Sequence, residues 1–245
     1  MLHGFLEDLS MWDDMVPALA EDHRVIRIDL LGHGKTESAG PSHSMEMQAE
    51  MVRSVLFELD VFGYSLIGHS MGGYVALAIA ELFPQEIRGL VLMNSTSLAD
   101  TAEKKHNRDR AIEAVRQNHR SFVRIAIPGL FAPSNRKKFA KQIKTLTAIS
   151  LSMEPNGIIA ALEGMKHRPD RSEVFKNIPV PKLMVIGEQD PALDLESLLP
   201  QSEYPGVKTV IFKDGHMSHI ENQAELLSSF LQFLNEVDQV RGHEE

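Results

Sequence analysis

The sequence predicts an α/β protein with a mostly parallel sheet, helices on both faces, and a helical segment inserted between two strands. Short, mostly apolar runs such as 64–67 and 89–93 alternate with helical patterns, which is typical of strands buried on both faces. The alternation stops at about residue 98 and returns with 182–186. We therefore expect three parts: an N-terminal core over 1–97, a helical cap over 98–178, and a C-terminal core over 179–245.

Composition excludes several classes of protein. The chain has 245 residues, of which 43% are hydrophobic and 24% charged, as in ordinary globular proteins. It has no cysteine, which excludes disulfides, thiolate nucleophiles and zinc-thiolate sites. No apolar run reaches the roughly 18 residues that cross a bilayer, so we expect no membrane span. No secretory signal precedes the fold, which favours a cytoplasmic protein.

Charge is distributed unevenly along the chain. The net charge of −9 argues against binding to nucleic acid. Residues 98–178, however, hold 16 of the 25 basic residues and 8 of the 34 acidic ones. The rest of the chain holds 9 basic and 26 acidic residues. A positive segment inside a negative chain supports the boundaries of the predicted cap.

The helices and strands of the N-terminal core are predicted from the spacing of apolar residues and from residues typical of helix ends. Met47 and Met51 begin an apolar stripe at helical spacing, which predicts a helix that runs to about Asp60. Ser44 precedes this stripe and is a suitable N-cap. The other expected elements are a short helix over 15–19, strands over 24–30, 64–68 and 89–94, and a helix from Ser70 to before Pro84.

The remaining elements follow the same logic. Within the cap we expect helices over 100–120, 120–130, 134–152 and 156–167, broken at Pro128, Pro133 and Pro155. Beyond it we expect strands over 182–186 and 207–212, helices over 194–201 and 221–238, and a frayed tail over 241–245.

The stretch Gly68-His69-Ser70-Met71-Gly72 joins an apolar strand to an Ala-rich helix. A direct turn from strand to helix is crowded, and the glycines at 68 and 72 permit the close approach while Ser70 stays accessible. The positive end of the following helix points to the same place. An ordinary glycine-rich turn is the alternative, but the order of strand, turn and helix favours a nucleophilic Ser70.

A serine nucleophile needs a base and a group that orients the base. Asp190 follows the strand 182–186, and His216 follows the strand 207–212. Loops after parallel strands converge at one edge of the sheet, so we expect Ser70, His216 and Asp190 to form a triad. The rivals are the acidic residues Glu188, Asp194 and Asp214, and for the base His219.

Other histidines have simpler interpretations. His216 and His219 do not accompany a carboxylate at a recognised zinc spacing, so no metal site is expected. His69 should point away from the nucleophile and pack or shape the site. The group His3-Gly4-Phe5 stands at the end of an expected strand. The N–H of Phe5 is therefore placed to act as an oxyanion donor beside the N–H of Met71.

Together, these segments resemble the α/β-hydrolase superfamily, specifically its cap-bearing serine esterases. The matching segments are 3–5, 29–34, 68–73, 187–191 and 215–221. The resemblance implies Ser70 as nucleophile, His216 as base and acid, Asp190 as orienter, Phe5 and Met71 as oxyanion hole, and no cofactor. It also implies cleavage of a small carboxylic ester or lactone through an acyl-enzyme.

One feature departs from the family pattern. Members normally have two antiparallel strands and a third strand before His-Gly, and this sequence begins where that third strand ends. In the family's sheet order, the third strand lies between the strands at 24–30 and 64–68. Removal of this central strand would leave backbone groups of both neighbouring strands unpaired, which is costly. This cost favours a start of the sequence that is trimmed or assigned too late over a truncated variant that repacks.

The substrate stays open at this level. The basic cap suggests an acidic substrate or an acyl group on an acidic carrier protein. The alternative is that its lysines and arginines, Arg136, Lys137, Lys138, Lys141 and Lys144, only solvate an amphipathic helix. A C–C bond hydrolase or a perhydrolase would use the same triad, and a hydrolase fold that only binds is a further alternative.

Overall fold

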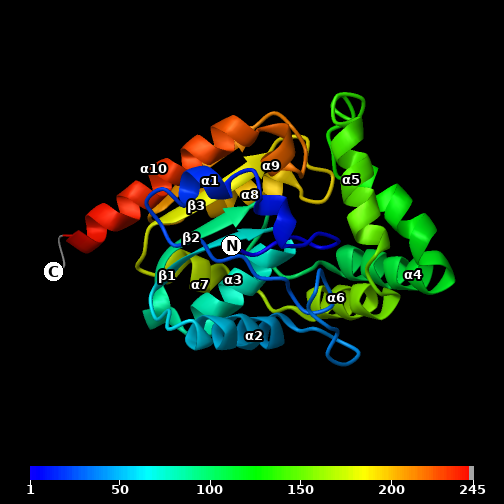
Figure 1. Cartoon of the computed structure of the whole chain (residues 1–245), viewed down its shortest axis with the longest axis horizontal. Coiled ribbons are helices and arrows are strands. Elements are labelled where there is room, and N and C mark those ends of the chain that lie inside the picture. The colour runs from blue at the N-terminus through cyan, green and yellow to red at the C-terminus, as the bar shows by residue number, and fades with distance from the viewer. Residues whose placement is uncertain (243–245) are drawn as a thin grey trace.

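A computed structural model describes residues 1–242. Its centre is a parallel four-stranded sheet in the order β1-β2-β3-β4 (Figure 1). The strands are β1 (Tyr64–His69), β2 (Ile87–Met93), β3 (Lys182–Gly187) and β4 (Val207–Phe212). Each pairs in parallel with the next along the chain. The predicted parallel α/β sheet is therefore confirmed.

Three N-terminal helices match their predictions closely: α1 (Val16–Leu19), α2 (Met45–Glu58) and α3 (Met71–Leu82). Two short 3₁₀ helices, η1 (Leu9–Trp12) and η2 (Pro84–Glu86), were not predicted. The side chain of Ser44 accepts a hydrogen bond from the N–H of Met47 at 3.2 Å. It thereby satisfies one of the free donors at the start of α2, as expected of a cap.

Four helices lie between β2 and β3: α4 (Ala102–Gly129), α5 (Ala140–Leu151), α6 (Pro155–His167) and α7 (Ser172–Asn177). Asn118 breaks α4 with φ −162° and ψ 88°, close to the predicted boundary at 120. Helix α5 begins later than predicted, because Asn135 is held in a turn by its bonds to Asp214 and Glu221. The short helix α7 was not predicted. Helices α4 to α6 stand beside the sheet (Figure 1).

The C-terminal part contains α8 (Leu195–Ser202), α9 (Ser218–Glu221) and α10 (Gln223–Gly242). The predicted final helix over 221–238 is present as α10, which begins at Gln223. The short helix α9 was not predicted, and the backbone turns at Asn222 (φ −135°) between α9 and α10. Most of the predicted tail over 241–245 lies outside the described residues. Within residues 1–242, no helix is both long and apolar enough to cross a membrane.

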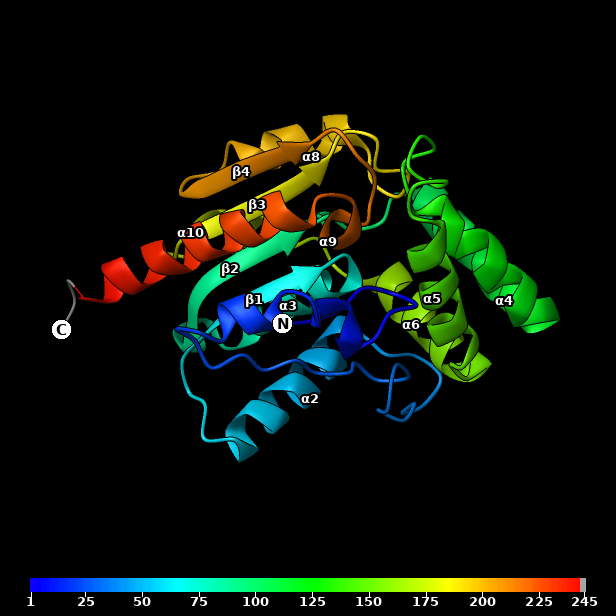
Figure 2. The same cartoon turned by 45° about the horizontal axis from the view of Figure 1, so that its top comes forward.

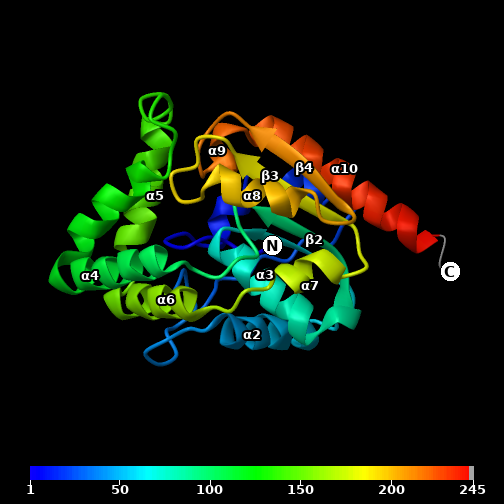
Figure 3. The same cartoon turned by 180° about the vertical axis from the view of Figure 1, so that it is seen from behind.

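Helices cover both faces of the sheet (Figures 2 and 3). On one face, Ile67, Val91 and Val185 pack with residues of α1 and α10. On the other, their strand neighbours, including Leu66, Leu90 and Met184, pack with α2, α3 and α8. Alternate residues of each strand therefore face opposite layers. All the strands point their carboxyl ends the same way, toward the edge where the candidate residues follow β1, β3 and β4.

The predicted strand over 24–30 is wrong as a strand. Only Ile28 pairs there, in an isolated parallel bridge with Leu2, and Leu2 bridges Gly68 on its other side. Leu2 donates its N–H to Ile67 O at 2.8 Å and accepts from the N–H of His69 at 3.0 Å. Residues 1–2 thus occupy the expected place between the two segments. They offer too little backbone to pair with all of 24–30, since each ladder bond needs a facing residue.

A cavity of about 530 Å³ continues from this place toward the amino ends of the strands. Residues 22–26 and 60–67 line its two sides. Ser70 follows the opposite, carboxyl end of β1. This cavity is therefore separate from the candidate active site.

Candidate active site

Ser70 stands at a strained corner between β1 and α3. Its φ of 50° and ψ of −113° lie in a region that side chains other than glycine rarely adopt. The N–H of Ser70 donates to Met93 O at 2.9 Å, and Ser95 Oγ donates to Ser70 O at 2.8 Å. These two bonds tie the corner to the neighbouring strand and its loop. The predicted geometry of the turn is present.

The glycine at 72 permits the close approach that this corner requires. A Cβ added there would lie 2.4 Å from Leu2 O and 2.7 Å from His3 O. Because both atoms belong to backbone, no side-chain rotation would relieve the clash. The first turn of α3 therefore lies directly against residues 2–3, which lead to Phe5.

Ser70, His216 and Asp190 form one continuous chain of hydrogen bonds. Ser70 Oγ lies 2.9 Å from His216 Nε2, and His216 Nδ1 lies 2.6 Å from Asp190 Oδ2. The three side chains follow β1, β4 and β3 respectively. Both His216 and Asp190 are buried, and Ser70 is half-buried. The structure thus brings together the three residues that the sequence predicts to cooperate.

Asp190 is held ionised by its surroundings. Burial alone would raise the pKa of its carboxyl, but the charge and hydrogen bond of His216 and the N–H of Ala192 outweigh burial and lower it. Oδ1 accepts from the N–H groups of Ala192 and Leu193, at 2.8 and 3.2 Å. Oδ2 also accepts from Asn94 Nδ2 at 3.2 Å. Asn94 was not predicted as a site residue, although a polar residue at the end of an apolar strand was a usable signal.

The loop that carries His216 is anchored to the inserted segment. His216 donates its N–H to Leu130 O at 2.9 Å. The buried carboxylate of Glu221 accepts from the N–H of Gly215 and the N–H of Ala132, both at 3.1 Å. Glu221 therefore holds the base loop and the end of α4 in one arrangement. Its role was not predicted, because the two partners are far apart in sequence.

The rival residues lie elsewhere. Asp214 accepts from Asn135 and Asn222 at 2.8 and 2.7 Å. Asp194 is exposed at the start of α8, and Glu188 is exposed after β3. His219 is buried against Glu7, where its Nε2 lies 3.4 Å from Glu7 Oε1. None of the four takes part in the hydrogen-bond chain through Ser70.

The segment His3-Gly4-Phe5 lies beside the start of α3. His3 Nε2 accepts from the N–H of Leu30 at 2.9 Å, and Nδ1 lies 2.8 Å from Gly4 O, so the ring is assigned as a neutral Nδ1–H tautomer. Burial lowers the pKa of His3 in accord with this state. Among residues 1–242, no acceptor takes the N–H of Phe5 or of Met71. Both donors are thus available to a ligand.

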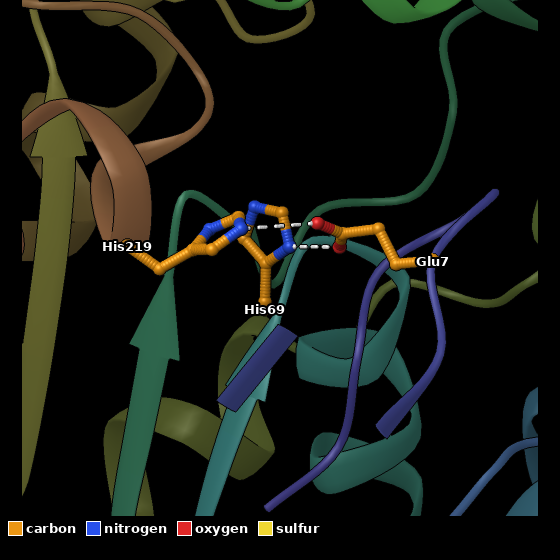
Figure 4. A group of neighbouring side chains, drawn as sticks. All are labelled: Glu7, His69 and His219. Carbon is orange, nitrogen blue, oxygen red and sulfur yellow. Dashed lines mark hydrogen bonds and ion pairs between the residues drawn. The ribbon is translucent and has the colours of Figure 1, made fainter. Parts of the chain in front are cut away.

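A second buried cluster consists of Glu7, His69 and His219 (Figure 4). His69 Nδ1 lies 2.7 Å from Glu7 Oε2. Burial opposes the charge on Glu7, but His69 outweighs it and holds the pKa of Glu7 at about 2. Burial lowers the pKa of His219 to about 4, so that ring is neutral at pH 7. Glu7 was not singled out in the sequence, because no local pattern connects it with His69.

This cluster is also the place among the described residues where three potential metal-binding groups meet. One ligand atom from each side chain lies within 4.8 Å of the others. The short contact between His69 and Glu7 is explained by a hydrogen bond between the imidazole and the carboxylate.

Comparison with known proteins places the chain in a family. The model of the alpha/beta hydrolase fold matches residues 1–223. The chain therefore belongs to the α/β hydrolase family.

Particular relatives include several kinds of protein. A putative 2-succinyl-6-hydroxy-2,4-cyclohexadiene-1-carboxylate synthase of Bacillus subtilis is 30% identical, over 94% of this chain and 88% of its own length. A thermophilic esterase from Thermogutta terrifontis superposes with a TM-score of 0.90 at 29% identity, over 96% and 88% of the two chains. The enol-lactonase from Burkholderia xenovorans LB400 has a TM-score of 0.88 at 22% identity, over 96% and 89%, which shows a shared fold.

Proposed function

We propose that this protein is a serine hydrolase that cleaves a small carboxylic ester or lactone through an acyl-enzyme. The observation that carries the proposal is the hydrogen-bond chain from Ser70 Oγ through His216 to Asp190, with contacts of 2.9 and 2.6 Å. A serine hydroxyl next to an imidazole that a carboxylate orients has the arrangement needed to attack a carbonyl.

The reaction proceeds in two half-reactions. His216 Nε2 takes the proton of Ser70 as Oγ attacks the carbonyl carbon, and Asp190 stabilises the imidazolium that forms. His216 then gives this proton to the departing alcohol oxygen, which leaves an ester on Ser70. Water attacks that ester by the same route, with His216 first as base and then as acid, and the carboxylic acid is released.

The N–H groups of Phe5 and Met71 are proposed to form the oxyanion hole. Both N–H groups lack an acceptor among the described residues, and residues 2–3, which lead to Phe5, lie against the first turn of α3. The amino end of α3 adds a partial positive charge. Each donor would lower the barrier by about 3 kcal/mol.

Ester hydrolysis is favoured by the likeness to the Thermogutta esterase. A second candidate is cleavage of a C–C bond, since a 2-hydroxymuconate semialdehyde hydrolase from Pseudomonas is 26% identical over 97% of this chain and 87% of its own length. A perhydrolase would use the same triad, and a non-catalytic protein that only binds its ligand would keep the same hydrolase fold. The proposed mechanism needs only groups of the chain and water, and no cofactor.

Hydrolysis of p-nitrophenyl acetate, butyrate and octanoate, measured beside Ser70→Ala, tests the proposal. We expect turnover by the native protein and loss of at least about 10⁴-fold in the variant, because no nucleophile remains. A folded native protein without Ser70-dependent turnover of these esters would exclude the esterase assignment. Turnover of a vinylogous diketone but of no ester would favour C–C cleavage instead.

We also propose that residues 98–178 act as a cap over the site and that their positive charge favours an anionic substrate, such as an acidic ester or an acyl group on an acidic carrier protein. Five side chains support the charge argument, since all are exposed: Arg136, Lys137, Lys138, Lys141 and Lys144. The hydrogen bond from His216 N–H to Leu130 O supports the role of residues 98–178 as a cap, because it joins this segment to the loop that carries the base.

Salt dependence tests the role of this charge. Added salt should lower kcat/KM for an anionic ester and leave a matched neutral ester unchanged, because screening weakens only the first attraction. The double change Lys141→Gln and Lys144→Gln should reduce this salt response, whereas Lys208→Gln on β4 should not. An equal response of both esters would mean that the lysines only solvate α5.

A further inference from the structure

The ring of His69 is placed between the carboxylate of Glu7 and the backbone oxygen of His216. Glu7 is ionised, since its pKa is held at about 2 and its Oε2 also accepts the N–H of Gly4, so both neighbours can only accept hydrogen bonds. His69 Nδ1 lies 2.7 Å from Glu7 Oε2, and His69 Nε2 lies 3.0 Å from the backbone oxygen of His216. A neutral imidazole carries one N–H and would leave one lone pair facing an acceptor. Only the imidazolium form satisfies both contacts.

We propose that His69 is a permanently protonated imidazolium and that the Glu7–His69 ion pair is the positioning element that holds the His216 loop against the Ser70 turn. This inference rests on the proposed function for its kinetic consequences. The protonation of His69 itself is independent of which substrate the protein takes.

The ion pair joins three parts of the site. Glu7 Oε2 also accepts the N–H of Gly4 at 2.9 Å, which fixes the segment that carries Phe5. His69 directly precedes Ser70 in sequence. The Nε2–H of His69 holds the main chain of His216. One buried pair thus sets the relative positions of the oxyanion donor, the nucleophile and the base.

The charges around His69 agree with this assignment. Burial favours the neutral ring, but the charge and hydrogen bond of Glu7 outweigh burial and raise the pKa of His69. The other titratable groups facing the ring are His216, His219 and Asp190. His219 is neutral, so the cluster holds one positive and one negative charge, and an uncompensated charge is not left in the interior.

Replacement of Glu7 by glutamine should therefore change the proton on His69. Without the carboxylate, burial favours the neutral ring, which can donate to only one of its two neighbours. The N–H of Gly4 donates to the Oε2 position, so the amide oxygen of glutamine stays there and the remaining proton of His69 stays on Nδ1. Nε2 then has no proton to donate to His216 O, that contact weakens, and the base shifts relative to Ser70. Misplacement of a reacting group by about 1 Å costs roughly 10²-fold in rate.

The decisive measurement is ¹⁵N NMR of the histidine rings at about pH 8, above the ordinary histidine pKa. The His69 signals are assigned by their loss in His69→Gln. We expect both ring nitrogens of His69 to carry protons in the native protein, and only one in Glu7→Gln. A native His69 with a single protonated nitrogen would overturn the proposal, even if the protein proves to be an active esterase.

Kinetics then separates positioning from general stability. Glu7→Gln should lower kcat about 10²-fold with little change in KM, while Asp8→Asn, a change in the adjacent carboxylate that caps η1, should leave kcat unchanged. His69→Gln should resemble Glu7→Gln, and the double variant should be no slower than either, because the residues act as one unit. Additive losses would contradict the proposal.

A metal at the same place is the competing outcome. Added Zn²⁺ would then shift the ring signals of both His69 and His219 and remove the proton from His69 Nδ1. We expect these signals to be unchanged by Zn²⁺ and by a chelator, because Glu7 and the proton on His69 already satisfy each other. Loss of the Nδ1 proton on addition of Zn²⁺ would replace the ion pair with a metal site.

Discussion

Asp190→Asn is expected to lower kcat by about 10⁴-fold with little change in KM. The reason is the proton on His216. The oxygen Oδ1 of Asp190 receives two backbone N–H groups, from Ala192 and Leu193, so the amide oxygen of asparagine stays there. Its NH₂ group then faces His216 Nδ1 in place of Oδ2. The ring must accept at Nδ1 and carry its proton on Nε2, where it can no longer take the proton of Ser70.

The control is Asp194→Asn, which changes an exposed carboxylate near the same loop. It should keep the native kcat and a free energy of unfolding within about 1 kcal/mol of that of the native protein. Steady-state kinetics on p-nitrophenyl butyrate provides the comparison. If Asp194→Asn loses activity and Asp190→Asn keeps it, the orienting residue has been assigned wrongly.

Gly72→Ala is expected to destabilise the protein by about 1–3 kcal/mol and to reduce turnover. Alanine in a helix normally gains about 0.5–1 kcal/mol over glycine, but here its Cβ would lie 2.4 Å from Leu2 O. That oxygen accepts the N–H of His69, so it cannot retreat without loss of a hydrogen bond. Movement of residues 2–3 would also displace the N–H of Phe5. Urea unfolding measures the first effect and kcat the second.

Gly129→Ala is the matched change in another helix. A Cβ at Gly129 would have no heavy atom within 4 Å, so we expect unchanged or slightly greater stability and native kcat. The contrast isolates the close approach at Gly72 from the general preference of helices for alanine. Equal stabilisation by both changes would show that α3 does not press on residues 2–3 in solution.

Several parts of the fold were predictable because their causes are local. Apolar runs and helical spacing located β1 to β4, and Ser44 located the start of α2. The order strand, glycine-rich turn, helix predicted the corner at Ser70. The rule that loops meet at the carboxyl edge of a parallel sheet then paired Asp190 with His216.

Other features depend on contacts between distant segments. Residues 24–30 have the composition of a strand, but a strand exists only where a neighbouring segment pairs with it. Here only Met1 and Leu2 do so. The short helix α9 is separated from α10 by a turn at Asn222, whose side chain donates to Asp214 at 2.7 Å. Periodicity carries no information about such a partner.

The sequence by itself determined the α/β class, the turn that exposes Ser70, and the identity of the residues that follow the strands. Each of these depends on backbone preferences or on apolar spacing over a few residues. Only the tertiary structure decided that His216 rather than His219 meets Ser70, that Asn94 supports Asp190, and that Glu7 pairs with His69. Burial removes water from these polar groups, so each must find a partner inside the protein, and the partner is chosen by the packing of the whole chain.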